Sequence, residues 1–204
     1  MQRILFQGDS ITDWYRDYKD GITLGRGFVS YVAQKLQDQE VEVLNRGISG
    51  NTTLDMAKRF DVDGLALKPD LLTIMIGIND TWQAFLNQKI TPASEFKQIY
   101  RDVLLQVKQE TTAKLILMEP FLLPFPEDRK AWREDLDPKI HVVRELALEF
   151  DALLIPLDGL MNAAGIKYGF TKLIVDGVHP TDFGHHLLAD IWLDAVYKNG
   201  YLQL

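Results

Sequence analysis

Three residues have the types and spacing needed for nucleophilic catalysis: Ser10, Asp176 and His179. A serine hydroxyl becomes a nucleophile when a base takes its proton, and a third group must orient that base. A turn could bring the Asp176 carboxylate onto Nδ1 of His179 and leave Nε2 facing the serine, as in a Ser-His-Asp triad. Each residue alone would be read more simply, as a turn serine or a structural Asp–His hydrogen bond. Together they predict acyl transfer.

The other histidines are less suited to be the base. His141 falls within an amphipathic helical pattern, and His185 and His186 fall in the first turns of the last predicted helix. Asp182 with His185 and His186 could hold a metal ion, but helix packing is the better interpretation. The chain has no cysteine, which excludes a thiol nucleophile, a Cys-ligated zinc and a disulfide framework. No cofactor and no metal are implied.

An acyl-transfer site also needs hydrogen-bond donors for the oxyanion that forms on the ester carbonyl. The candidates are the backbone N–H groups of Ser10 and Gly50 and the side-chain amide of Asn79. A turn glycine and an Asx-turn would explain Gly50 and Asn79 individually. Their occurrence in one chain, with the three residues above, favours the catalytic interpretation.

Alternating strands and helices would have to position these residues. Short apolar runs predict five strands, at 4–6, 41–44, 71–76, 115–118 and 153–155. Apolar residues at helical spacing follow these runs, at 28–36, 54–60, 96–107, 140–150 and 187–192. Five strands separated by helices imply a parallel sheet with helices on both faces. Ligands bind such sheets outside the carboxyl ends of the strands, where the polar clusters of this sequence fall.

Composition narrows the class of protein further. With 22 basic and 29 acidic side chains the net charge is −7, which argues against a nucleic-acid partner. A length of 204 residues predicts a single domain spanning 1–204. No stretch reaches the roughly 18 apolar residues of a membrane span, so no membrane partner is expected. The apolar run at the N-terminus is too short for a signal peptide, and we therefore expect a cytoplasmic protein.

Four short clusters, at 8–11, 50–52, 77–80 and 176–180, resemble the four sequence blocks of the SGNH (GDSL-type) hydrolases. The resemblance extends from residue 4 to about residue 195. It implies a flavodoxin-like three-layer α/β/α sandwich with a five-stranded parallel sheet, in agreement with the strand and helix pattern. A Gly-x-Ser-x-Gly elbow, a Gly-x-Gly-x-x-Gly loop, a phosphate-binding P-loop and a His-Glu-x-x-His motif are all absent from the sequence.

The same resemblance implies a role for each candidate residue. Ser10 would be the nucleophile, His179 the base and Asp176 the group that orients the base. The Ser10 N–H, the Gly50 N–H and the Asn79 amide would form the oxyanion hole. The flanking carboxylates Asp9 and Asp80 are expected to be structural.

Longer stretches point to a substrate class. Residues 47–52, 68–70 and 74–82 are similar to the intracellular acetylxylan-esterase branch, whose members remove acetyl groups from xylo-oligosaccharides and tend to form closed homo-oligomers. One departure is Val175, directly before the triad acid, where that branch would have tryptophan. The expected substrate is a small ester, an acetylated sugar, and the expected assembly is a homo-oligomer.

Aromatic residues near the predicted site have two interpretations. Trp14 and Trp82 could be stacking platforms for a sugar, or they could belong to the core or to an interface between subunits. The segment 119–137, with the apolar run 121–125, could line an acyl pocket, act as a lid or form a subunit interface. Two alternatives to the carbohydrate esterase stay open: a lysophospholipase- or thioesterase-like lipolytic hydrolase of longer acyl esters, and a non-catalytic carbohydrate-binding domain.

Overall fold

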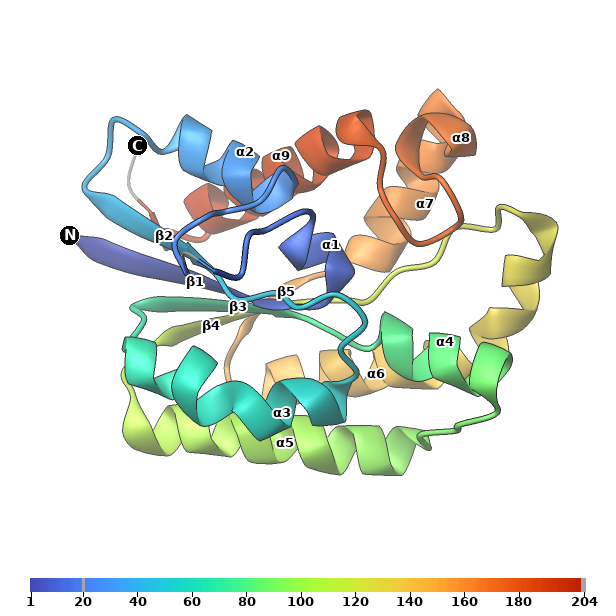
Figure 1. The fold of residues 1–204 in the computed structure, drawn as a ribbon, viewed down its shortest axis with the longest axis horizontal. Coiled ribbons are helices and arrows are strands. Elements are labelled where there is room, and N and C mark those ends of the chain that lie inside the picture. Colours follow the sequence, from blue (N-terminus) through green and yellow to red (C-terminus); the bar gives the residue numbers. More distant parts are fainter. Residues whose placement is uncertain (20, 203–204) are drawn as a thin grey trace.

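A five-stranded parallel sheet forms the centre of the protein (Figure 1). The computed structural model describes residues 1–19 and 21–202. The strands are β1 (Gln2–Gly8), β2 (Val41–Asn45), β3 (Leu71–Met75), β4 (Lys114–Met118) and β5 (Leu153–Ile155). Their spatial order is β2-β1-β3-β4-β5, the flavodoxin-like order. The predicted strands and fold class are confirmed.

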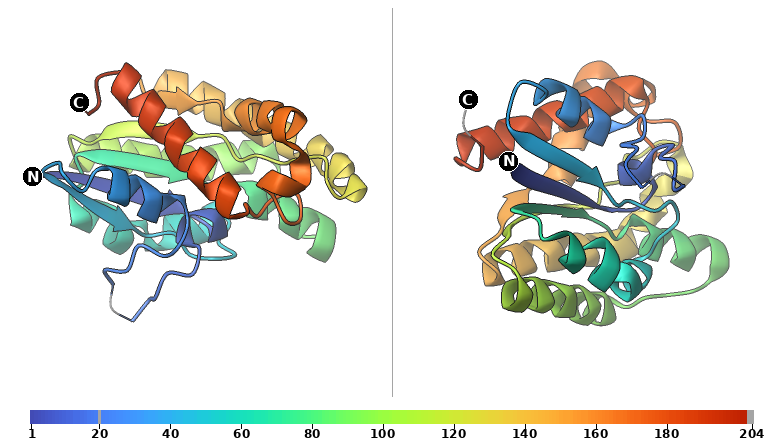
Figure 2. Two further views of the ribbon diagram at one scale, coloured as in Figure 1. Left: turned by 90° about the horizontal axis from the view of Figure 1, so that it is seen from above. Right: turned by 60° about the vertical axis from the view of Figure 1, so that its left-hand side comes forward.

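Side chains that alternate along each strand build a hydrophobic core on both faces of the sheet. In β1, Ile4 and Phe6 pack in the cluster under α2 (Phe28–Lys35) and α9 (Asp182–Lys198). Leu5 between them packs in the second cluster, under α3 (Thr53–Asp63), α5 (Ala93–Glu110) and α6 (Arg133–Glu149). All three strand residues are fully buried, which is why their run is continuously apolar. Figure 2 shows the two helical layers on either side of the sheet.

Several short or weakly patterned elements were not predicted. They are α1 (Ser10–Asp13), α4 (Ile78–Asn87), α7 (Leu157–Tyr168), α8 (Phe170–Leu173) and the 3₁₀ turns η1 (Leu65–Leu67) and η2 (Glu127–Trp132). In α7 the apolar side chains do not stay on one face, because Ile166 is 82% exposed and Leu160 is 41% exposed. This blurs the 3.6-residue periodicity on which a helix prediction rests.

Helix ends follow local chemistry. Thr52 is the N-cap of α3 and forms a capping box with Asp55. Thr181 is the N-cap of α9, and its side chain accepts a hydrogen bond from the N–H of Gly184. Pro92 is the N-cap of α5. None of the helices in the described residues has the length and apolar character of a membrane span.

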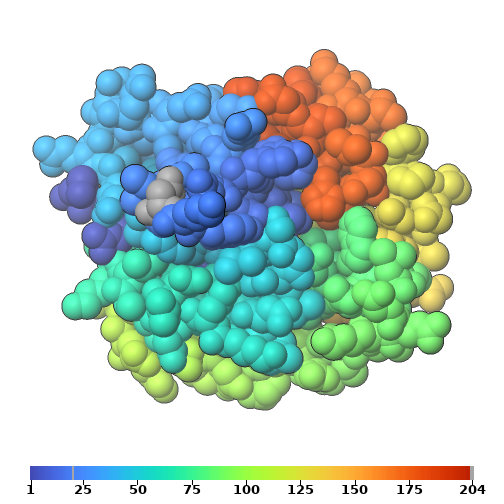
Figure 3. Space-filling view, viewed as in Figure 1, coloured from blue at the N-terminus to red at the C-terminus, as the bar shows by residue number. Residues whose placement is uncertain are grey.

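The carboxyl ends of β1 and β3 lie at the point where the chain reverses its direction across the sheet. After β1 the chain crosses to β2 on one side, and after β2 it returns to β3 on the other. Adjacent connections therefore leave in opposite directions and open a crevice there. On the surface in Figure 3, segments coloured near residue 15, residue 80 and residue 175 adjoin one another.

Candidate active site

Ser10 is the first residue of α1 and follows β1 almost directly. Asp9 caps this short helix, because its Oδ1 accepts the N–H of Ile11 at 3.1 Å. Burial raises the pKa of Asp9 to about 7. The cap fixes the backbone beside Ser10, whose Oγ lies 3.0 Å from Nε2 of His179.

A tight turn holds the acid against the base. Oδ2 of Asp176 lies 2.7 Å from Nδ1 of His179, and Oδ1 accepts the N–H groups of Val178 and His179 at 3.1 and 2.8 Å. Gly177, between them, has φ +96°, a backbone conformation that glycine adopts without strain. The turn is closed where the Val175 N–H donates to the His179 carbonyl. Ser10, His179 and Asp176 thus form one hydrogen-bonded chain.

Their pKa values fit this chain. Burial alone would raise the pKa of Asp176, but hydrogen bonds from the His179 ring and backbone outweigh it and lower the pKa to about 2. The hydrogen bond to Asp176 raises the pKa of His179, against the opposing effect of partial burial. The acid therefore stays ionised, and the histidine becomes a stronger base.

Two indole rings flank the imidazole. The ring of His179 lies 6.0 Å from that of Trp14 and 5.7 Å from that of Trp82, measured between centroids. Trp14 in turn packs on His185 at 4.6 Å. Both tryptophans line the same cleft as Ser10, so they are placed to meet a substrate as well as to support the base.

The three predicted oxyanion donors line this cleft together. Ser10, Gly50 and Asn79 all contribute to its wall, in a cavity of about 490 Å³. The Asn79 side-chain amide donates to the Asn51 carbonyl at 3.1 Å, which ties the segment after β3 to the segment after β2. Among the described residues, the N–H groups of Ser10 and Gly50 have no protein acceptor. Unpaired N–H groups at a cleft are suited to receive an oxyanion.

Asp13 and Arg16 support the segment before Gly50, and neither was predicted. Oδ2 of Asp13 accepts hydrogen bonds from the Ser49 N–H at 3.2 Å, from the Ser49 hydroxyl and from the Tyr18 hydroxyl at 2.6 Å. The Arg16 guanidinium donates to the Gly47 carbonyl at 2.8 Å. Both side chains are only 5% exposed, which is unusual for acidic and basic residues and indicates a functional or structural role. The sequence alone does not reveal this burial.

Asp80 links the helices on which two site segments begin. Its Oδ2 accepts the N–H and the hydroxyl of Thr53 at 2.9 and 3.0 Å, joining the first turn of α4 to that of α3. Burial raises the pKa of Asp80 to about 6. The contacts are structural and hold Asn79 beside the segment of Gly50.

The histidines of α9 have packing partners. Nδ1 of His185 accepts the Phe28 N–H at 3.2 Å, and burial lowers the pKa of His185 to about 3, so the ring stays neutral. His186 stacks on Tyr31 at 3.7 Å and lies 3.9 Å from Asp182. Within residues 1–19 and 21–202 we find no group of three or more acidic or histidine side chains placed to hold a metal ion.

The first three residues of the apolar run after β4 belong to the core, so they do not act as a lid or line the cleft of Ser10. Phe121, Leu122 and Leu123 are at most 1% exposed and belong to the core cluster beneath α9. The Leu123 N–H donates to the Gly177 carbonyl at 2.9 Å, so this segment lies directly behind the triad turn. Its contacts with the site are made through the backbone and through η2.

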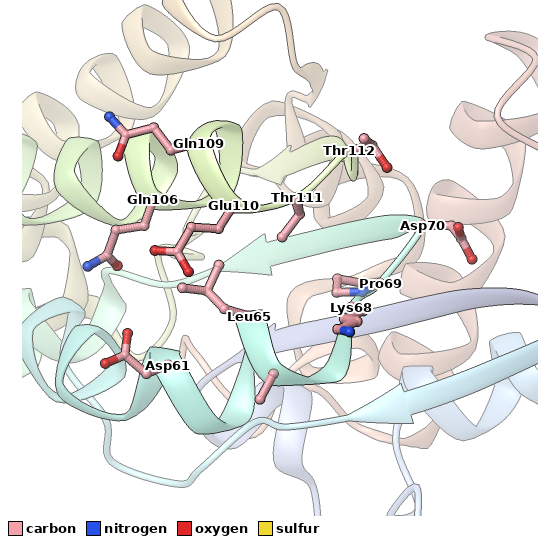
Figure 4. Close-up of a pocket in the computed structure, with 11 residues that line it drawn as sticks. Asp61, Leu65, Lys68, Pro69, Asp70, Gln106, Gln109, Glu110, Thr111 and Thr112 are labelled. Atoms are coloured by element: carbon pink, nitrogen blue, oxygen red, sulfur yellow. The ribbon is translucent and has the colours of Figure 1, made fainter.

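A larger groove, of about 1000 Å³, lies at the opposite ends of the strands (Figure 4). Residues preceding β3 and β4 line it, including Lys68, Asp70 and Thr112, together with Asp61 and Glu110 from α3 and α5. No residue of the Ser10–His179–Asp176 chain lies there. We place the candidate site in the smaller cleft, because that cleft holds the groups able to do chemistry.

Comparisons with known proteins agree with this geometry. The sequence model of the GDSL-like Lipase/Acylhydrolase family matches residues 6–187. An acetylxylan esterase from Geobacillus stearothermophilus is 35% identical over 207 aligned residues, covering 96% of this chain and 94% of that protein. The crystal structure of Axe2, an acetylxylan esterase from that organism, has a TM-score of 0.84 at 33% identity and covers 96% of this chain and 94% of its own. The crystal structure of a protein from Parabacteroides merdae described as a GDSL-like lipase has a TM-score of 0.89 at 31% identity. The match covers 95% of this chain and 94% of that protein.

Proposed function

The chain belongs to the GDSL-like Lipase/Acylhydrolase family and is a carboxylic ester hydrolase; we propose that it removes acetyl groups from carbohydrates such as xylo-oligosaccharides, with Ser10 as the nucleophile. The observation that carries the proposal is the chain of contacts from Ser10 Oγ to His179 Nε2, at 3.0 Å, and from His179 Nδ1 to Asp176 Oδ2, at 2.7 Å. Similarity to the acetylxylan esterase of Geobacillus stearothermophilus supports the substrate class.

In the proposed reaction, Nε2 of His179 takes the hydroxyl proton of Ser10 while Oγ attacks the acetyl carbonyl carbon. The carbonyl oxygen becomes an oxyanion that the N–H groups of Ser10 and Gly50 and the amide of Asn79 stabilise. His179 then gives its proton to the leaving sugar oxygen, and the ester C–O bond breaks. Water attacks the acetyl-serine with His179 again as base, which releases acetate and restores the Ser10 hydroxyl.

The wall of the cleft supports a short acyl group on a sugar. It consists of aromatic, polar and glycine residues without an aliphatic side chain: Ser10, Asp13, Trp14, Tyr15, Arg16, Tyr18, Ser49, Gly50, Asn79, Trp82 and His179. Tyr15 is 74% exposed and Tyr18 is 53% exposed, so their rings are available to the apolar faces of a sugar. A long acyl chain gains about 0.8 kcal/mol for each CH₂ only where an apolar pocket buries it.

The test is a chain-length series of p-nitrophenyl acetate, butyrate and octanoate, run beside an acetylated xylo-oligosaccharide and with Ser10→Ala as the blank. We expect acetate and the acetylated sugar to be cleaved far faster than octanoate, and Ser10→Ala to be nearly inactive while keeping its fold. Octanoate as the fastest substrate, with the sugar ester untouched, would establish the lipolytic alternative. Wild-type turnover by a clean Ser10→Ala preparation would overturn the assignment of the nucleophile.

We further propose a cytoplasmic location and a closed homo-oligomer. Both rest on the branch that residues 47–52 and 74–82 resemble. Light scattering after gel filtration tests the assembly, and fractionation of the source cells tests the location.

A further inference from the structure

Arg129, in η2, reaches across to the turn that carries the triad acid. Its Nε donates to the backbone carbonyl of Asp176 at 3.0 Å, and its side chain is 13% exposed. The aliphatic stem lies on Gly177, where a Cβ atom would come within 2.8 Å of Cγ of Arg129. The side chain therefore fixes the backbone on both sides of the Asp176–Gly177 peptide bond.

The same guanidinium lies over two aromatic rings beside the base. Its central carbon is 4.2 Å from the ring centroid of Trp132 and 5.4 Å from that of Trp82, distances typical of cation–π contacts. Trp82 meets Trp132 edge to face at 5.1 Å and lies against the His179 ring at 5.7 Å. Arg129 thus contacts the turn of the acid and a ring that supports the base.

We propose that Arg129 is a positioning residue for the triad, and that the segment 119–137 serves to carry it. This inference rests on the proposed function of the Ser10–His179–Asp176 chain. The donor at Nε sets where the Asp176 carbonyl lies, and so how the carboxylate meets His179. Arg129 lies outside the residues that line the cleft, so it acts on the reaction through its neighbours.

Positioning, rather than charge, is the physical basis. The guanidinium is already paired with Asp128 at 2.7 Å, and a cation near the triad would oppose the positive charge that His179 gains during proton transfer. The remaining groups that interact electrostatically with His179 are Asp9 and His185, which Arg129 does not contact. Changes at Arg129 leave both in place.

Two uncharged variants isolate the hydrogen bond. Arg129→Gln keeps an N–H donor at the chain position of Nε, whereas Arg129→Met puts a methyl group there, and both remove the same charge. We expect Arg129→Met to lower kcat for p-nitrophenyl acetate by about 10- to 100-fold relative to Arg129→Gln, with little change in KM. Lys130→Met is the matched control, because Lys130 is a neighbour in η2 that pairs with Glu127 and does not contact the turn.

Two readouts separate positioning from a merely structural role. The acidic limb of kcat/KM should lie at lower pH in Arg129→Met than in Arg129→Gln, because a loosened bond to Asp176 raises the pKa of His179 less. The downfield NMR signal of the His179 Nδ1 proton should persist in Arg129→Gln and broaden in Arg129→Met. That signal is recorded on the resting protein, so it tests the positioning role even if the wild type cleaves no ester.

Equal kcat, equal acidic limbs and equal proton signals in the two variants would overturn the proposal. If Arg129→Met does not fold, Arg129→Ala takes its place in each comparison with Arg129→Gln. A wild type without esterase activity would refute the proposed function alone, and an unchanged Nδ1 proton would refute the positioning role alone.

Discussion

The side-chain amide of Asn79 donates a hydrogen bond to the backbone carbonyl of Asn51, at 3.1 Å. One amide hydrogen is therefore used to join the segment after β3 to the segment that contains Gly50. The second hydrogen stays available on the same nitrogen, at the wall of the cleft. The hydrogen bond to Asn51 orients the Asn79 amide before the substrate arrives and leaves its second N–H unused. A donor oriented in advance stabilises a developing negative charge efficiently.

We expect Asn79→Ala to lower kcat by about 10²- to 10³-fold, the usual effect of removing one oxyanion donor. The effect on KM should be smaller, since the charge exists only in the transition state. Steady-state kinetics with p-nitrophenyl acetate measure both constants, and Asn87→Ala, at the exposed end of α4, serves as the control. A rise in KM alone would make Asn79 a contact for the bound substrate instead.

Asp176→Asn should be nearly as damaging as loss of the nucleophile. The single amide oxygen would accept the Val178 and His179 N–H groups, so the NH2 group would face Nδ1 as a donor, and the ring of His179 would lose its productive tautomer. In the best-studied triad this change costs about 10⁴-fold in kcat. Single-turnover kinetics on p-nitrophenyl acetate, with circular dichroism to verify the fold, measure the effect. If Asp176→Asn kept wild-type turnover, a different acid would have to orient His179.

The pH dependence of kcat/KM should follow His179. Its ring must be neutral to accept the Ser10 proton, so activity should rise as pH increases through the pKa of His179. Asp176 raises that pKa above the ordinary 6.5, so the midpoint of the rise should lie above 6.5. Rates on p-nitrophenyl acetate, corrected with Ser10→Ala for spontaneous hydrolysis, measure the midpoint. A profile that is flat from about pH 5 to about pH 9 would contradict a histidine base.

Sequence patterns predicted the central strands of the sheet because these strands are buried on both faces. The runs around Ile4–Phe6 and 115–118 are continuously apolar, and the first of them ends at the polar cluster 8–11, so the type of element follows from the sequence pattern. Helix α4 was missed because its first turn is itself a site cluster, with Asp80 buried for its hydrogen bonds to Thr53 rather than for packing.

The residues of the site likewise fall into those that the sequence predicted and those that only the structure reveals. Ser10, Asp176 and His179 were predicted from residue types that are informative in combination, and the structure places His179 within hydrogen-bonding distance of the other two. Arg129 acts on Asp176 from 47 positions away, and Asp13 acts on Ser49 from 36 positions away. Acidic and basic side chains at such spacing look like ordinary surface residues until the fold brings them to their partners.

Asp13→Asn should lower kcat about tenfold, the loss expected when one hydrogen bond to a charged acceptor is removed. The variant leaves a donor facing the Ser49 N–H, or else facing Arg16, so the segment leading to Gly50 becomes less well fixed. Asp17→Asn is the matched control, because among the described residues that exposed carboxylate accepts a hydrogen bond only from the Lys19 N–H. Steady-state kinetics with p-nitrophenyl acetate measure kcat for both variants. Equal activity in the two would show that Asp13 does not support the oxyanion donor.

Asp9→Asn should stabilise the protein at neutral pH and have little effect in acid. Burial raises the pKa of Asp9 from 3.8 to about 7, so between these values the folded state keeps a proton that the unfolded state releases. The Asp9 contribution to the free energy of unfolding therefore falls as pH rises, by about 1.4 kcal/mol for each unit of pKa difference. Asparagine does not titrate, and its Oδ1 can still accept the Ile11 N–H. Urea unfolding at several pH values should show that the free energy of unfolding of Asp9→Asn, relative to that of the wild type, increases as pH rises. The control variant Asp17→Asn should show no such increase. A difference that is constant with pH would mean that Asp9 has the same pKa in the folded and unfolded states.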